Sequence, residues 1–581
     1  MSSTPFPDSR NPNSLWAGVL VETLVRGGIR TAVISPGSRS APLAFAFARH
    51  PGIEAIPVLD ERSAAFFALG LAKATGRTTA LVCTSGSAAA NYFPAVVEAR
   101  ESGVPLLIIT ADRPPEMRAC ASGQTIDQQK LYGDYVSFFH ELAVPEMTVP
   151  RLRYLRQTVA HALQRTRQPQ RGPVHLNAPF RDPLPPLPDD GTTTALAATV
   201  DWTTFFTHLP EATLKTGALA AGPRLGADVH GVIIAGAAQP AHPAGYAQVV
   251  GELARKLGWP VLADALSPLR NHADVVPQLV TSYDTILRNE NAAERLKPEL
   301  VLCLDGWPTS KVLRAWLEAS DAPVWLMSER IDNRDALHGR TRQSSLSLAT
   351  LAGSLPATTE ANGYERLWAA FERKARAALD ARLGATAELF EGKAAWLLAR
   401  HLPVATPLSL GNSMPVRDVE YFWPGNVRRV PSFFNRGANG IDGTLSTALG
   451  VAHGTDRPAV LLTGDLALLH DTNGFLLRPK VRGSLTVVVI NNRGGGIFEH
   501  LPVAQFEPTF EEFFATPQEA DFEKLAAAYG AGYVLVRDWD HFTGLISALP
   551  ASGVRVIELR TDRKRDAAFR KRVFAEIAAG L

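Results

Sequence analysis

The sequence predicts an α/β fold of three domains, each a mainly parallel sheet flanked by helices. Short apolar runs alternate with helical patterns along the chain, which is typical of βαβ units and parallel sheets. The length of 581 residues suits about three domains of roughly 100–200 residues each. Two stretches that read as linkers place these domains at residues 1–185, 200–355 and 365–581.

The first domain is predicted from five apolar runs separated by helical patterns. The runs are residues 31–34, 54–59, 79–83, 105–110 and 173–176, with helical patterns at 63–75 and 88–101. The segment 182–194 then contains four prolines. Proline at that density neither continues a helix nor sits inside a sheet, so we interpret the segment as a linker.

The second and third domains follow the same alternation. Strands of the second domain are predicted at residues 231–235, 260–263, 300–304 and 323–327, and a weaker linker at 355–363. The third domain opens with a long helical pattern at 364–402. Its predicted strands are residues 407–410, 429–434, 458–463, 485–490, 532–536 and 554–559. The first and third domains are therefore similar in pattern, with a different domain between them.

The charge balance argues against nucleic acid and membrane surfaces as partners. Lys and Arg total 59 against 57 Asp and Glu, and no long run of one charge occurs. No apolar run approaches the roughly 18 residues that span a bilayer, and the N-terminus lacks the apolar core of a signal peptide. The three cysteines are far apart, so neither a disulfide framework nor a cysteine metal site is expected. We expect a soluble cytoplasmic protein without membrane insertion.

Asp465 and Asn492 are the strongest signal for a binding site. They lie 27 positions apart, and each follows an apolar run that reads as a buried strand. Ligands of open α/β sheets bind at the carboxyl ends of such strands. A carboxylate, an amide oxygen and a nearby backbone carbonyl suit Mg²⁺ that takes its other ligands from water and a diphosphate. Gly464 stands where backbone must approach a phosphate closely.

This pattern, Gly464-Asp465 followed by Asn491-Asn492, resembles the cofactor motif of the thiamin diphosphate-dependent decarboxylase and acetohydroxyacid synthase superfamily. Its members have a pyrimidine-binding, a middle and a diphosphate-binding domain, in the order predicted here. The resemblance implies that Asp465, Asn492 and the carbonyl of Gly494 hold Mg²⁺ (or Mn²⁺) beside thiamin diphosphate. Leu466 stands where the motif usually has glycine, which narrows the family.

The motif Asp60-Glu61-Arg62-Ser63 lies at the end of a predicted strand and the start of a helix. From the residues alone, a carboxylate there is a cap or a solvated first-turn charge. The superfamily resemblance instead implies that Glu61 shares a proton with N1′ of the cofactor's aminopyrimidine and so activates the thiazolium. It also implies a cofactor between the pyrimidine domain of one chain and the diphosphate domain of another, hence a homodimer or a dimer of dimers.

Arginines follow several predicted strands in the first and third domains. They lie in the loops 35–40, 110–115, 411–417 and 435–443, and the polar loop 123–128 is close in sequence to the second of these. Guanidinium groups bind carboxylates as bidentate forks, so four arginines at the same ends of parallel sheets favour a polyanionic substrate. A decarboxylase of pyruvate, which has one carboxylate, would not be expected to need four arginines.

These loops resemble one family closely, the 2-succinyl-5-enolpyruvyl-6-hydroxy-3-cyclohexene-1-carboxylate synthases of menaquinone biosynthesis. The matching strings include SPGSRSAPL, DERSAAFFALGLA, TADRPPE, GNSMPVRD and NRGANGIDGTLSTALG, and they span the first and third domains nearly end to end. These transferases decarboxylate 2-oxoglutarate and add the succinyl carbanion to isochorismate by 1,4-addition. Both substrates are dicarboxylates, which fits the arginines.

The resemblance also implies a role for each matching residue. Residues that would contact the substrates or the intermediate are Ser38, Arg39, Arg113, Gln124, Lys311, Ser413, Arg417 and Arg436, with Ile497 and Phe498 as an apolar wall. Residues that would bind the cofactor are Glu61, Gly411, Ser413, Ile441, Gly464, Asp465, Leu466, Asn492 and Gly494. Ile441 would be the wedge that bends the cofactor.

The middle domain departs from the family at one position. Lys311 matches the family's lysine, but Val312 stands where some members have arginine. Arg314 follows Lys311 by three residues, so it either shares the same helical face or is solvated. No role follows for His470, Glu499 or His500, although they lie near the predicted site.

Two other functions stay open at this point. Another 2-oxoacid decarboxylase or an acetohydroxyacid synthase would share the cofactor motif, although the arginine-rich loops and Leu466 count against both. A non-catalytic binding member of the fold is the third hypothesis. Such a protein would be expected to lose Glu61, Asp465 or Asn492, and this chain has all three.

Overall fold

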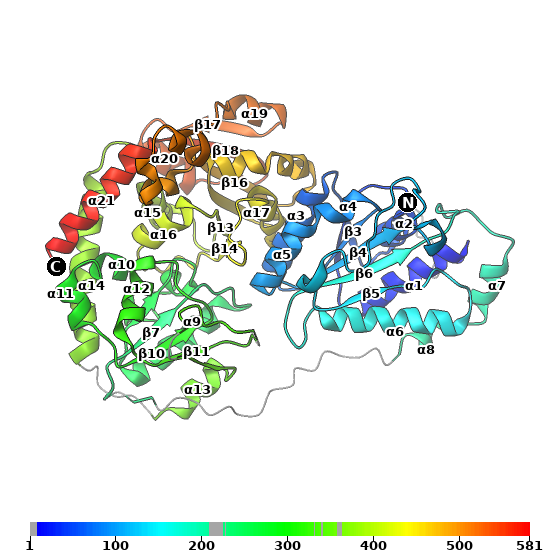
Figure 1. The fold of residues 1–581 in the computed structure, drawn as a ribbon, viewed down its shortest axis with the longest axis horizontal. Helices are drawn as coiled ribbons and strands as arrows, with labels where there is room; N and C mark the ends of the chain where they lie inside the picture. The colour runs from blue at the N-terminus through cyan, green and yellow to red at the C-terminus, as the bar shows by residue number, and fades with distance from the viewer. Residues whose placement is uncertain (1–7, 208–224, 227, 331, 339–340, 357–362) are drawn as a thin grey trace. The chain divides into compact units, whose positions relative to one another are not determined.

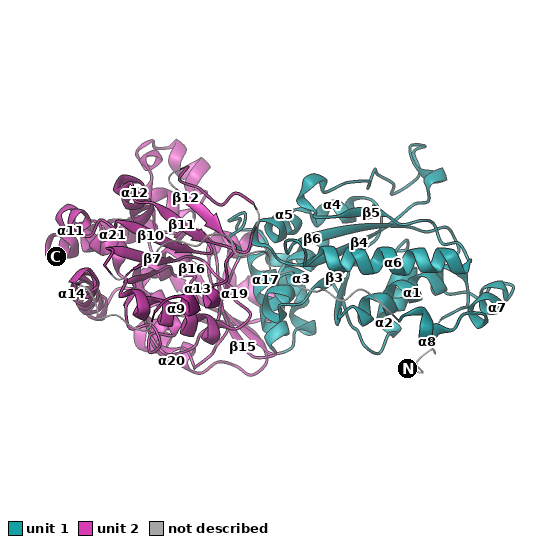
Figure 2. Cartoon of the chain, turned by 90° about the horizontal axis from the view of Figure 1, so that it is seen from below, with its two compact units in different colours: residues 1–215, 435–455, 471–482 teal, residues 216–434, 456–470, 483–581 magenta. Residues whose placement is uncertain are grey.

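The computed structural model describes residues 8–207, 225–226, 228–330, 332–338, 341–356 and 363–581. Three six-stranded sheets are present in this part of the chain, and all their strand pairs are parallel (Figure 1). The predicted fold class is therefore confirmed. The chain divides into two compact units (Figure 2): unit 1 is residues 1–215, 435–455 and 471–482, and unit 2 is the remainder. The linker predicted at 355–363 lies largely outside the described residues.

Unit 1 contains the first sheet, in the order β2-β1-β3-β4-β6-β5. Its strands are β1 (Thr31–Ile34), β2 (Glu54–Pro57), β3 (Thr79–Cys83), β4 (Leu106–Asp112), β5 (Phe139–Glu141) and β6 (Pro173–Pro179). Its helices include α1 (Pro12–Arg26), α2 (Ala41–Arg49), α3 (Glu61–Thr75), α4 (Ser87–Asn91), α5 (Phe93–Ser102), α6 (Val149–Arg165), α7 (Thr192–Ala198), α8 (Trp202–Phe205) and α17 (Thr444–Thr455). Both β3 and β4 are buried along their whole length, which explains their continuous apolar sequences.

Helix α3 is buried because it packs on β3 and also on α17. The two helices approach closely at two glycines: a Cβ on Gly450 would lie 3.0 Å from the Cα of Gly70. The first turn of α3 is capped by Asp60, whose Oδ1 accepts a hydrogen bond from the backbone N–H of Ser63 at 3.0 Å. The helix that begins with Glu61 is therefore fixed at its start and along its length.

The second sheet, in unit 2, has the order β12-β11-β10-β7-β8-β9. Its strands are β7 (Gly231–Ala235), β8 (Val261–Ala263), β9 (Leu279–Val280), β10 (Leu300–Leu304), β11 (Val324–Met327) and β12 (Thr341–Ser344). The helices of this region are α9 (Pro243–Leu257), α10 (Tyr283–Ile286), α11 (Glu290–Arg295), α12 (Lys311–Ser320), α13 (Leu348–Ser354) and α14 (Gly363–Ala385). Apolar clusters cover both faces of this sheet.

The third sheet, also in unit 2, has the order β14-β13-β15-β16-β18-β17. Its strands are β13 (Leu408–Leu410), β14 (Ser432–Phe434), β15 (Pro458–Gly464), β16 (Ser484–Asn491), β17 (Gly532–Leu535) and β18 (Gly553–Arg560). Its helices are α15 (Glu391–His401), α16 (Met414–Phe422), α18 (Asp465–His470), α19 (Phe522–Ala528), α20 (Trp539–Ser547) and α21 (Arg563–Ala579). Gly464 pairs with Ile490, so β15 and β16 end side by side.

The structure corrects the sequence-based expectations at four elements. Three short edge strands, β5, β9 and β12, were not predicted because they lack long apolar runs. The single helix predicted at 364–402 is wrong, since α14 ends at Ala385 and α15 begins at Glu391. Phe390 between them has extended backbone, with φ −128° and ψ 125°. This break places Glu391 in a buried polar cluster of the third sheet.

Two further observations bear on function. In the described ranges no helix combines the length and the apolar character needed to cross a membrane. Cys83 and Cys303 are buried, as their apolar surroundings in the sequence predict, and Cys120 is exposed. Burial raises the pKa of the Cys83 thiol, so this group stays a neutral core side chain.

Candidate active site

Asp465 lies where β15 ends and α18 begins. It is 5% exposed. Its Oδ2 accepts a hydrogen bond from the backbone N–H of Gly494 at 2.9 Å, and its Oδ1 accepts one from the N–H of Leu466 at 2.7 Å. These bonds hold the carboxylate across the ends of β15 and β16. Burial raises the pKa of Asp465 to about 6 and Glu391 contributes to the rise, whereas the N–H groups of Gly494 and Leu466 oppose it.

Asn492 follows β16 and is buried, and its side-chain oxygen accepts no hydrogen bond from a described residue. Its Nδ2 donates to Oε2 of Glu391 at 2.9 Å. Its Oδ1 has no hydrogen-bond partner among the described residues. A buried acceptor without a partner costs about 1–3 kcal/mol, so the site is more stable once something occupies that oxygen. Because Glu391 also acts on Asp465, the three side chains form one cluster.

The two glycines at this cluster have different roles: Gly464 adjoins open space, whereas Gly494 lets the loop pack against the backbone of Ala515. A Cβ on Gly464 would meet nothing within 4 Å, so open space adjoins Asp465. Gly494 has φ +123°, and a Cβ there would lie 2.2 Å from the carbonyl oxygen of Ala515. The Gly494 carbonyl accepts a hydrogen bond from the N–H of Gly496 at 2.8 Å and keeps a second lone pair. This set of hard oxygen atoms fits Mg²⁺ or Mn²⁺.

A buried charge network supports Asn492. Glu391 accepts a hydrogen bond on Oε1 from Nη2 of Arg570 at 2.5 Å. Arg570 also donates to both carboxylate oxygens of Asp418, at 2.8 and 2.9 Å. Burial raises the pKa of Asp418 to about 7, and the Arg570 charge opposes that rise. The network fixes the Glu391 carboxylate and therefore the orientation of the Asn492 amide.

Ser413 and Arg417 are held at the start of α16, after β13. Gly411 lies tightly against β15, since its Cβ would be 3.1 Å from Oγ1 of Thr463. Ser413 has φ +70°, a conformation that costs a non-glycine residue about 1–3 kcal/mol. Its carbonyl accepts a hydrogen bond from Nη1 of Arg417 at 2.7 Å. Such strain is typical of functional sites.

The middle domain brings a second basic group toward α16. Burial lowers the pKa of Arg417, and the charge of Arg314 contributes to the lowering, so the two guanidinium groups lie near each other. Arg314 is half-buried, and its Nε donates to the Pro308 carbonyl at 2.6 Å. Lys311 is exposed at the first position of α12, whereas Val312 packs against the apolar core. Arg314 is therefore not a freely solvated side chain.

The segment after Gly494 forms a short 3-10 helix, η5 (Gly496–His500). Ile497 and Phe498 are half-buried there, and the Phe498 ring lies 5.9 Å from that of Phe514. Glu499 accepts from Arg563 at 2.9 Å, and Arg563 in turn donates to the Arg493 carbonyl at 2.6 Å. Glu499 therefore supports the loop after β16.

The histidines near this segment differ in environment. Burial lowers the pKa of His500 to about 4, and the charge of Arg570 adds to the lowering. Its Nε2 has no hydrogen-bond partner in the described part of the chain. His470, by contrast, is exposed at the end of α18. A buried neutral imidazole accepts or donates a hydrogen bond but carries no charge at neutral pH.

In unit 1, the neighbouring carboxylates of Asp60 and Glu61 have different hydrogen bonding. Asp60 caps α3, and its Oδ2 also accepts from Nδ2 of Asn473 at 2.7 Å. Glu61 is half-buried, and no hydrogen bond joins its carboxylate to another described residue. The capping role that the sequence left open for this motif therefore falls to Asp60. The Glu61 carboxylate stays available for a ligand.

Two predicted substrate residues, Arg113 and Gln124, meet at Ser85 in unit 1. Arg113 donates from Nη1 to the Ser85 hydroxyl and from Nη2 to the Gly123 carbonyl at 3.0 Å. Gln124 donates from Nε2 to the Ser85 carbonyl at 3.0 Å. Burial lowers the pKa of Arg113, and the nearby charge of Arg39 contributes. The ends of β1, β3 and β4 are adjacent in the sheet, which explains this convergence.

The loop after β1 presents its two predicted residues differently. Arg39 is 6% exposed and donates to the Phe180 carbonyl at 2.8 Å. Its Nε is buried and has no partner among the described residues, as is also the case for Nε of Arg113. Ser38 is exposed beside it. Nη1 of Arg39 also lies 3.4 Å from Oδ2 of the exposed Asp182, so each of the two arginines has protein partners and one Nε donor without a partner among the described residues.

Residues 435–441 form a loop that a buried ion pair holds against α3 and α5. Glu98 of α5 is 2% exposed and accepts from the backbone N–H groups of Gly437 at 3.0 Å and Ala438 at 2.7 Å. Lys73 of α3 lies 3.6 Å from Glu98 and donates to Oδ1 of Asn435 at 2.8 Å. Arg436 and Ile441 in this loop are both half-buried.

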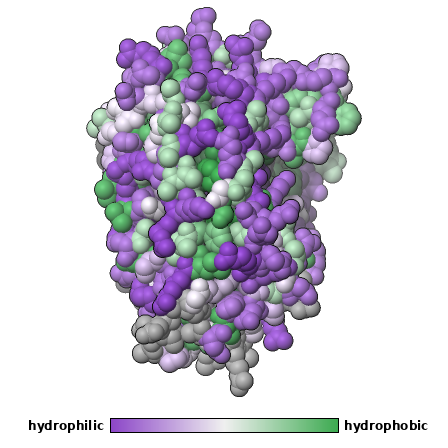
Figure 3. Space-filling model, turned by 90° about the vertical axis from the view of Figure 1, so that its left-hand side faces the viewer, coloured by the Kyte–Doolittle hydropathy of each residue, from purple (hydrophilic) through white to green (hydrophobic). Residues whose placement is uncertain are grey.

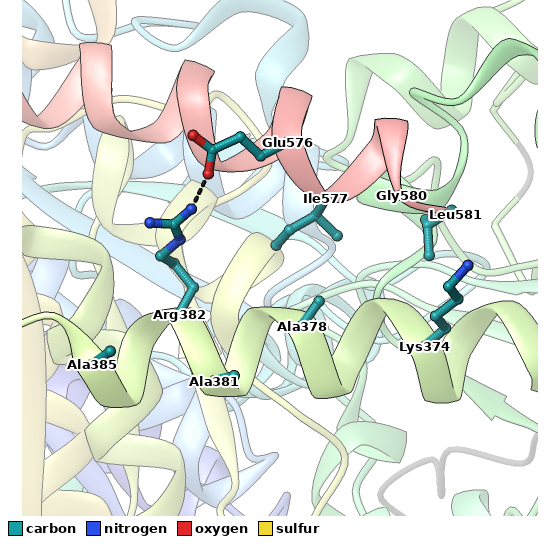
Figure 4. Close-up of a pocket in the computed structure, with 9 residues that line it drawn as sticks. All are labelled: Lys374, Ala378, Ala381, Arg382, Ala385, Glu576, Ile577, Gly580 and Leu581. Atoms are coloured by element: carbon teal, nitrogen blue, oxygen red, sulfur yellow. Dashed lines mark hydrogen bonds and ion pairs between the residues drawn. The ribbon is translucent and has the colours of Figure 1, made fainter.

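A separate groove lies between α14 and α21 (Figure 4). It is lined by Lys374, Ala378, Ala381, Arg382, Ala385, Glu576, Ile577, Gly580 and Leu581, and an ion pair joins Arg382 to Glu576. Figure 3 shows the molecule from the left-hand side of Figure 1, where hydrophilic side chains predominate and apolar ones lie scattered between them. None of the predicted site residues lines the groove, so we do not assign it to the site.

Four supporting residues, Ser85, Glu98, Glu391 and Arg570, were not predicted from the sequence. Ser85 lies inside the string TSGSAAAN, and its position directly after a predicted strand was the available signal. Glu391 and Glu98 lie within helical patterns, where a carboxylate usually faces solvent. Their burial follows from tertiary packing, so no local pattern identified them.

Comparison with known proteins gives three domain matches and full-length relatives. Residues 16–131 match the N-terminal binding domain of thiamine pyrophosphate enzymes, residues 226–408 the middle domain, and residues 421–559 the C-terminal binding domain. A 2-succinyl-5-enolpyruvyl-6-hydroxy-3-cyclohexene-1-carboxylate synthase of a Nostoc species is 52% identical and covers 98% of each chain. The protein of that name from Acaryochloris marina is 49% identical over 99% of this chain and 100% of its own.

Solved structures agree with the fold. The benzoylformate decarboxylase of Polynucleobacter necessarius superposes with a TM-score of 0.66 at 17% identity, covering 94% of this chain and 98% of its own. A thiamin diphosphate-dependent protein from Mycobacterium smegmatis gives a TM-score of 0.65, also at 17% identity, over 94% of this chain and 99% of its own. At this identity the likeness concerns the fold alone.

Proposed function

This chain belongs to the family of 2-succinyl-5-enolpyruvyl-6-hydroxy-3-cyclohexene-1-carboxylate synthases, within the thiamine pyrophosphate enzymes, and we propose that it catalyses that family's reaction. In this proposal 2-oxoglutarate loses CO₂ and its succinyl group is joined to isochorismate by 1,4-addition. The observation that carries the proposal is the extent of the similarity. It covers 98% of the chain, so it includes the middle domain and the substrate loops as well as the cofactor motif.

The cation would be held by Asp465, Asn492 and the Gly494 carbonyl. Support comes from the unpartnered Oδ1 of Asn492 and the open space at Gly464, which suit a cation and a diphosphate. When bound, thiamin diphosphate supplies the nucleophilic carbon and the electron sink for loss of CO₂. Leu466 and Gly411 would line this cofactor site, and Ile441 would press against the cofactor from the loop 435–441.

Glu61 would hold a proton between its carboxylate and the aminopyrimidine ring. Its half-buried position and its lack of hydrogen bonds to other described residues support this role. Asp60 leaves Glu61 free by supplying the helix cap.

The substrates' carboxylates would be bound by two basic groups. The group in unit 1 is Arg113 and Gln124, which both contact Ser85, together with Arg39, whose charge acts on Arg113, and Ser38 next to it in the chain. Arg417 and Ser413 lie on α16 of unit 2, with Lys311 and Arg314 on α12. Arg436 would add a further guanidinium, while Ile497 and Phe498 would exclude water from the carbon skeleton.

We further propose that the working form is at least a homodimer. The cofactor would then bind between the pyrimidine domain of one chain and the diphosphate domain of another. The family membership supports this arrangement.

The proposal is tested by measuring CO₂ release from 2-oxoglutarate and product formation with Mg²⁺ and thiamin diphosphate, with and without isochorismate. We expect a succinylated product that requires isochorismate. Activity on pyruvate without any product from isochorismate would contradict the proposal and favour a simpler decarboxylase or an acetohydroxyacid synthase.

A further inference from the structure

Glu420 of α16 is buried against the middle domain within unit 2. It is 1% exposed. Its Oε2 accepts hydrogen bonds from the backbone N–H of Ala265 at 2.6 Å and from Nη2 of Arg270 at 3.1 Å. Its Oε1 accepts one from the Tyr283 hydroxyl. One side chain of α16 therefore holds three points of the middle domain.

Arg270 reinforces this attachment from the other direction. Its Nη1 donates to the carbonyls of Val419, Glu420 and Trp423, at 3.1, 2.9 and 3.0 Å. The last carbonyls of a helix have no partner within the helix, so Arg270 caps the end of α16. Arg270 is fully buried, and its charge offsets that of Glu420.

The chain neighbours of Ala265 and Tyr283 hold the loop that leads to Lys311. Asp264 accepts a hydrogen bond on Oδ2 from the backbone N–H of Thr309 at 2.5 Å. Asp284 accepts one on Oδ2 from the Ser310 hydroxyl at 2.5 Å. Both carboxylates are buried, at 1% and 3% exposure. Two short paths therefore run from Glu420 to residues 309 and 310, directly before Lys311.

We infer that Glu420, Asp264 and Asp284 are positioning residues that hold the Lys311 loop at a set distance from Ser413 and Arg417 on α16. The inference rests on the proposed function, in which Lys311 and Arg417 bind substrate carboxylates, and it assigns to them the carboxylates of the second substrate, isochorismate. A displacement of about 1 Å can cost as much as 10²-fold in rate, so loosening this link lowers the use of the second substrate. The link includes neither the cation site nor Glu61. We therefore expect the rate of 2-oxoglutarate decarboxylation in the absence of isochorismate to stay unchanged.

The link itself is tested by hydrogen–deuterium exchange of the full-length protein. Asp264→Ala removes the acceptor of the Thr309 N–H, so we expect faster exchange at residues 309–314 while the interior of α16 keeps its protection. Ser310→Ala is a second variant that cuts the path through Asp284, and it also removes the cap of α12, because the Ser310 hydroxyl accepts a hydrogen bond from the Leu313 N–H at 3.0 Å. Unchanged exchange at residues 309–314 in both variants would overturn the inference, whatever reaction the protein catalyses.

Kinetics then test the role of the link. We expect Asp264→Ala and Ser310→Ala to raise the KM for isochorismate by about tenfold or more, while CO₂ release without isochorismate changes by less than about twofold. Glu420→Gln should have a KM between those of wild type and Glu420→Ala: its amide oxygen can accept from Ala265 and Arg270 and its N–H can donate to the Tyr283 oxygen, but the buried Arg270 loses its counter-charge. Glu420→Ala has neither group and should resemble Asp264→Ala.

Asp274→Ala is the matched control. It removes an exposed ion pair with Arg429 (2.6 Å) that joins the same two sheets of unit 2 but does not touch the Lys311 loop. Its KM for isochorismate should not change. An equal rise in the control, or a loss of kcat with an unchanged KM in Asp264→Ala, would overturn the positioning role. If wild-type protein forms no product from isochorismate, the proposed function fails, and the exchange result still decides whether the link exists.

Discussion

Glu391 accepts a hydrogen bond from Nδ2 of Asn492 at 2.9 Å and thereby turns Oδ1 of Asn492 into a buried acceptor without a partner among the described residues. The oxygen and the NH2 group of the amide differ in hydrogen bonding, one accepting and the other donating. Because the Glu391 carboxylate accepts, the NH2 group of Asn492 faces it and the oxygen faces away. Arg570 holds Glu391 from the other side, at 2.5 Å. Glu391, at the start of α15, therefore sets the orientation of Asn492, the proposed cation ligand, although it lies about a hundred residues earlier in the chain.

We predict that Glu391→Gln weakens Mg²⁺ binding by about 10–100-fold. Glutamine has one oxygen, which the charged Arg570 will keep, so its N–H group will face Asn492 and favour the flipped amide. The measurement is the Mg²⁺ dependence of turnover at saturating thiamin diphosphate, with direct Mg²⁺ titration beside it. Glu388→Gln, at an exposed position just before α15, is the control. An unchanged Mg²⁺ midpoint would show that Glu391 does not orient the ligand.

We predict that Glu61→Gln nearly abolishes turnover and leaves the fold intact. The change removes a proton-sharing carboxylate but keeps its size, and no hydrogen bond to another described residue is lost. The measurements are kcat and the melting temperature. Asp60→Asn is the control. Asparagine still caps the helix, and although its NH2 group replaces the oxygen that accepts from Asn473, the Asn473 amide can turn to present its own oxygen, so the variant should keep most of the activity. Turnover close to wild type in Glu61→Gln would refute the role of Glu61.

We predict that Gly70→Ala destabilises the protein by about 1–3 kcal/mol. A Cβ at Gly70 would lie 2.1 Å from the Thr447 carbonyl oxygen and 3.1 Å from the Cα of Gly450, and both are backbone atoms. Alanine normally stabilises a helix interior by about 0.5–1 kcal/mol relative to glycine, so here packing reverses the sign. Gly544→Ala in α20, where a Cβ meets nothing within 4 Å, should stabilise instead. Thermal denaturation compares the two, and a stabilising Gly70→Ala would show that α17 does not pack on α3 in solution.

The sequence predicted the parts of the site that depend on strand ends. Asp465 and Asn492 each follow an apolar run, and parallel neighbours end at one edge of a sheet, so their proximity follows from local patterns. Arg113 and Gln124 meet at Ser85 for the same reason.

The residues that support the site could not be predicted in this way. Glu391 and Arg570 meet because α15 and α21 pack on the third sheet, and the two residues are 179 positions apart in sequence. The break before Glu391 also escaped the helical pattern, because Leu389 and Phe390 continue its apolar period. The edge strands were missed because an edge needs little apolar surface.

His175 in β6 is a fully buried, neutral imidazole whose Nε2 bonds with Oγ1 of Thr110 at 2.7 Å. Its Nδ1 has no hydrogen-bond partner within the described ranges. Burial lowers the pKa of His175 to about 3, against roughly 6.5 in an unfolded chain. Between these two values the unfolded chain binds a proton and the folded chain does not. Stability must therefore fall as the pH drops from about 6.5 toward 3.

We predict that His175→Gln makes the free energy of unfolding less dependent on pH, because the unfolded variant binds one proton fewer. The wild-type free energy of unfolding should fall by about 1.4 kcal/mol per pH unit more steeply than that of the variant below pH 6. Glutamine is uncharged throughout and can still bond with Thr110, so the variant's slope loses only the histidine's share. The measurement is denaturant unfolding of the full-length protein at about pH 6.5, 5.5 and 4.5. His242→Gln makes the same change at an exposed site and should keep the wild-type slope. Equal slopes in His175→Gln and wild type would mean that His175 titrates alike in the folded and unfolded chains.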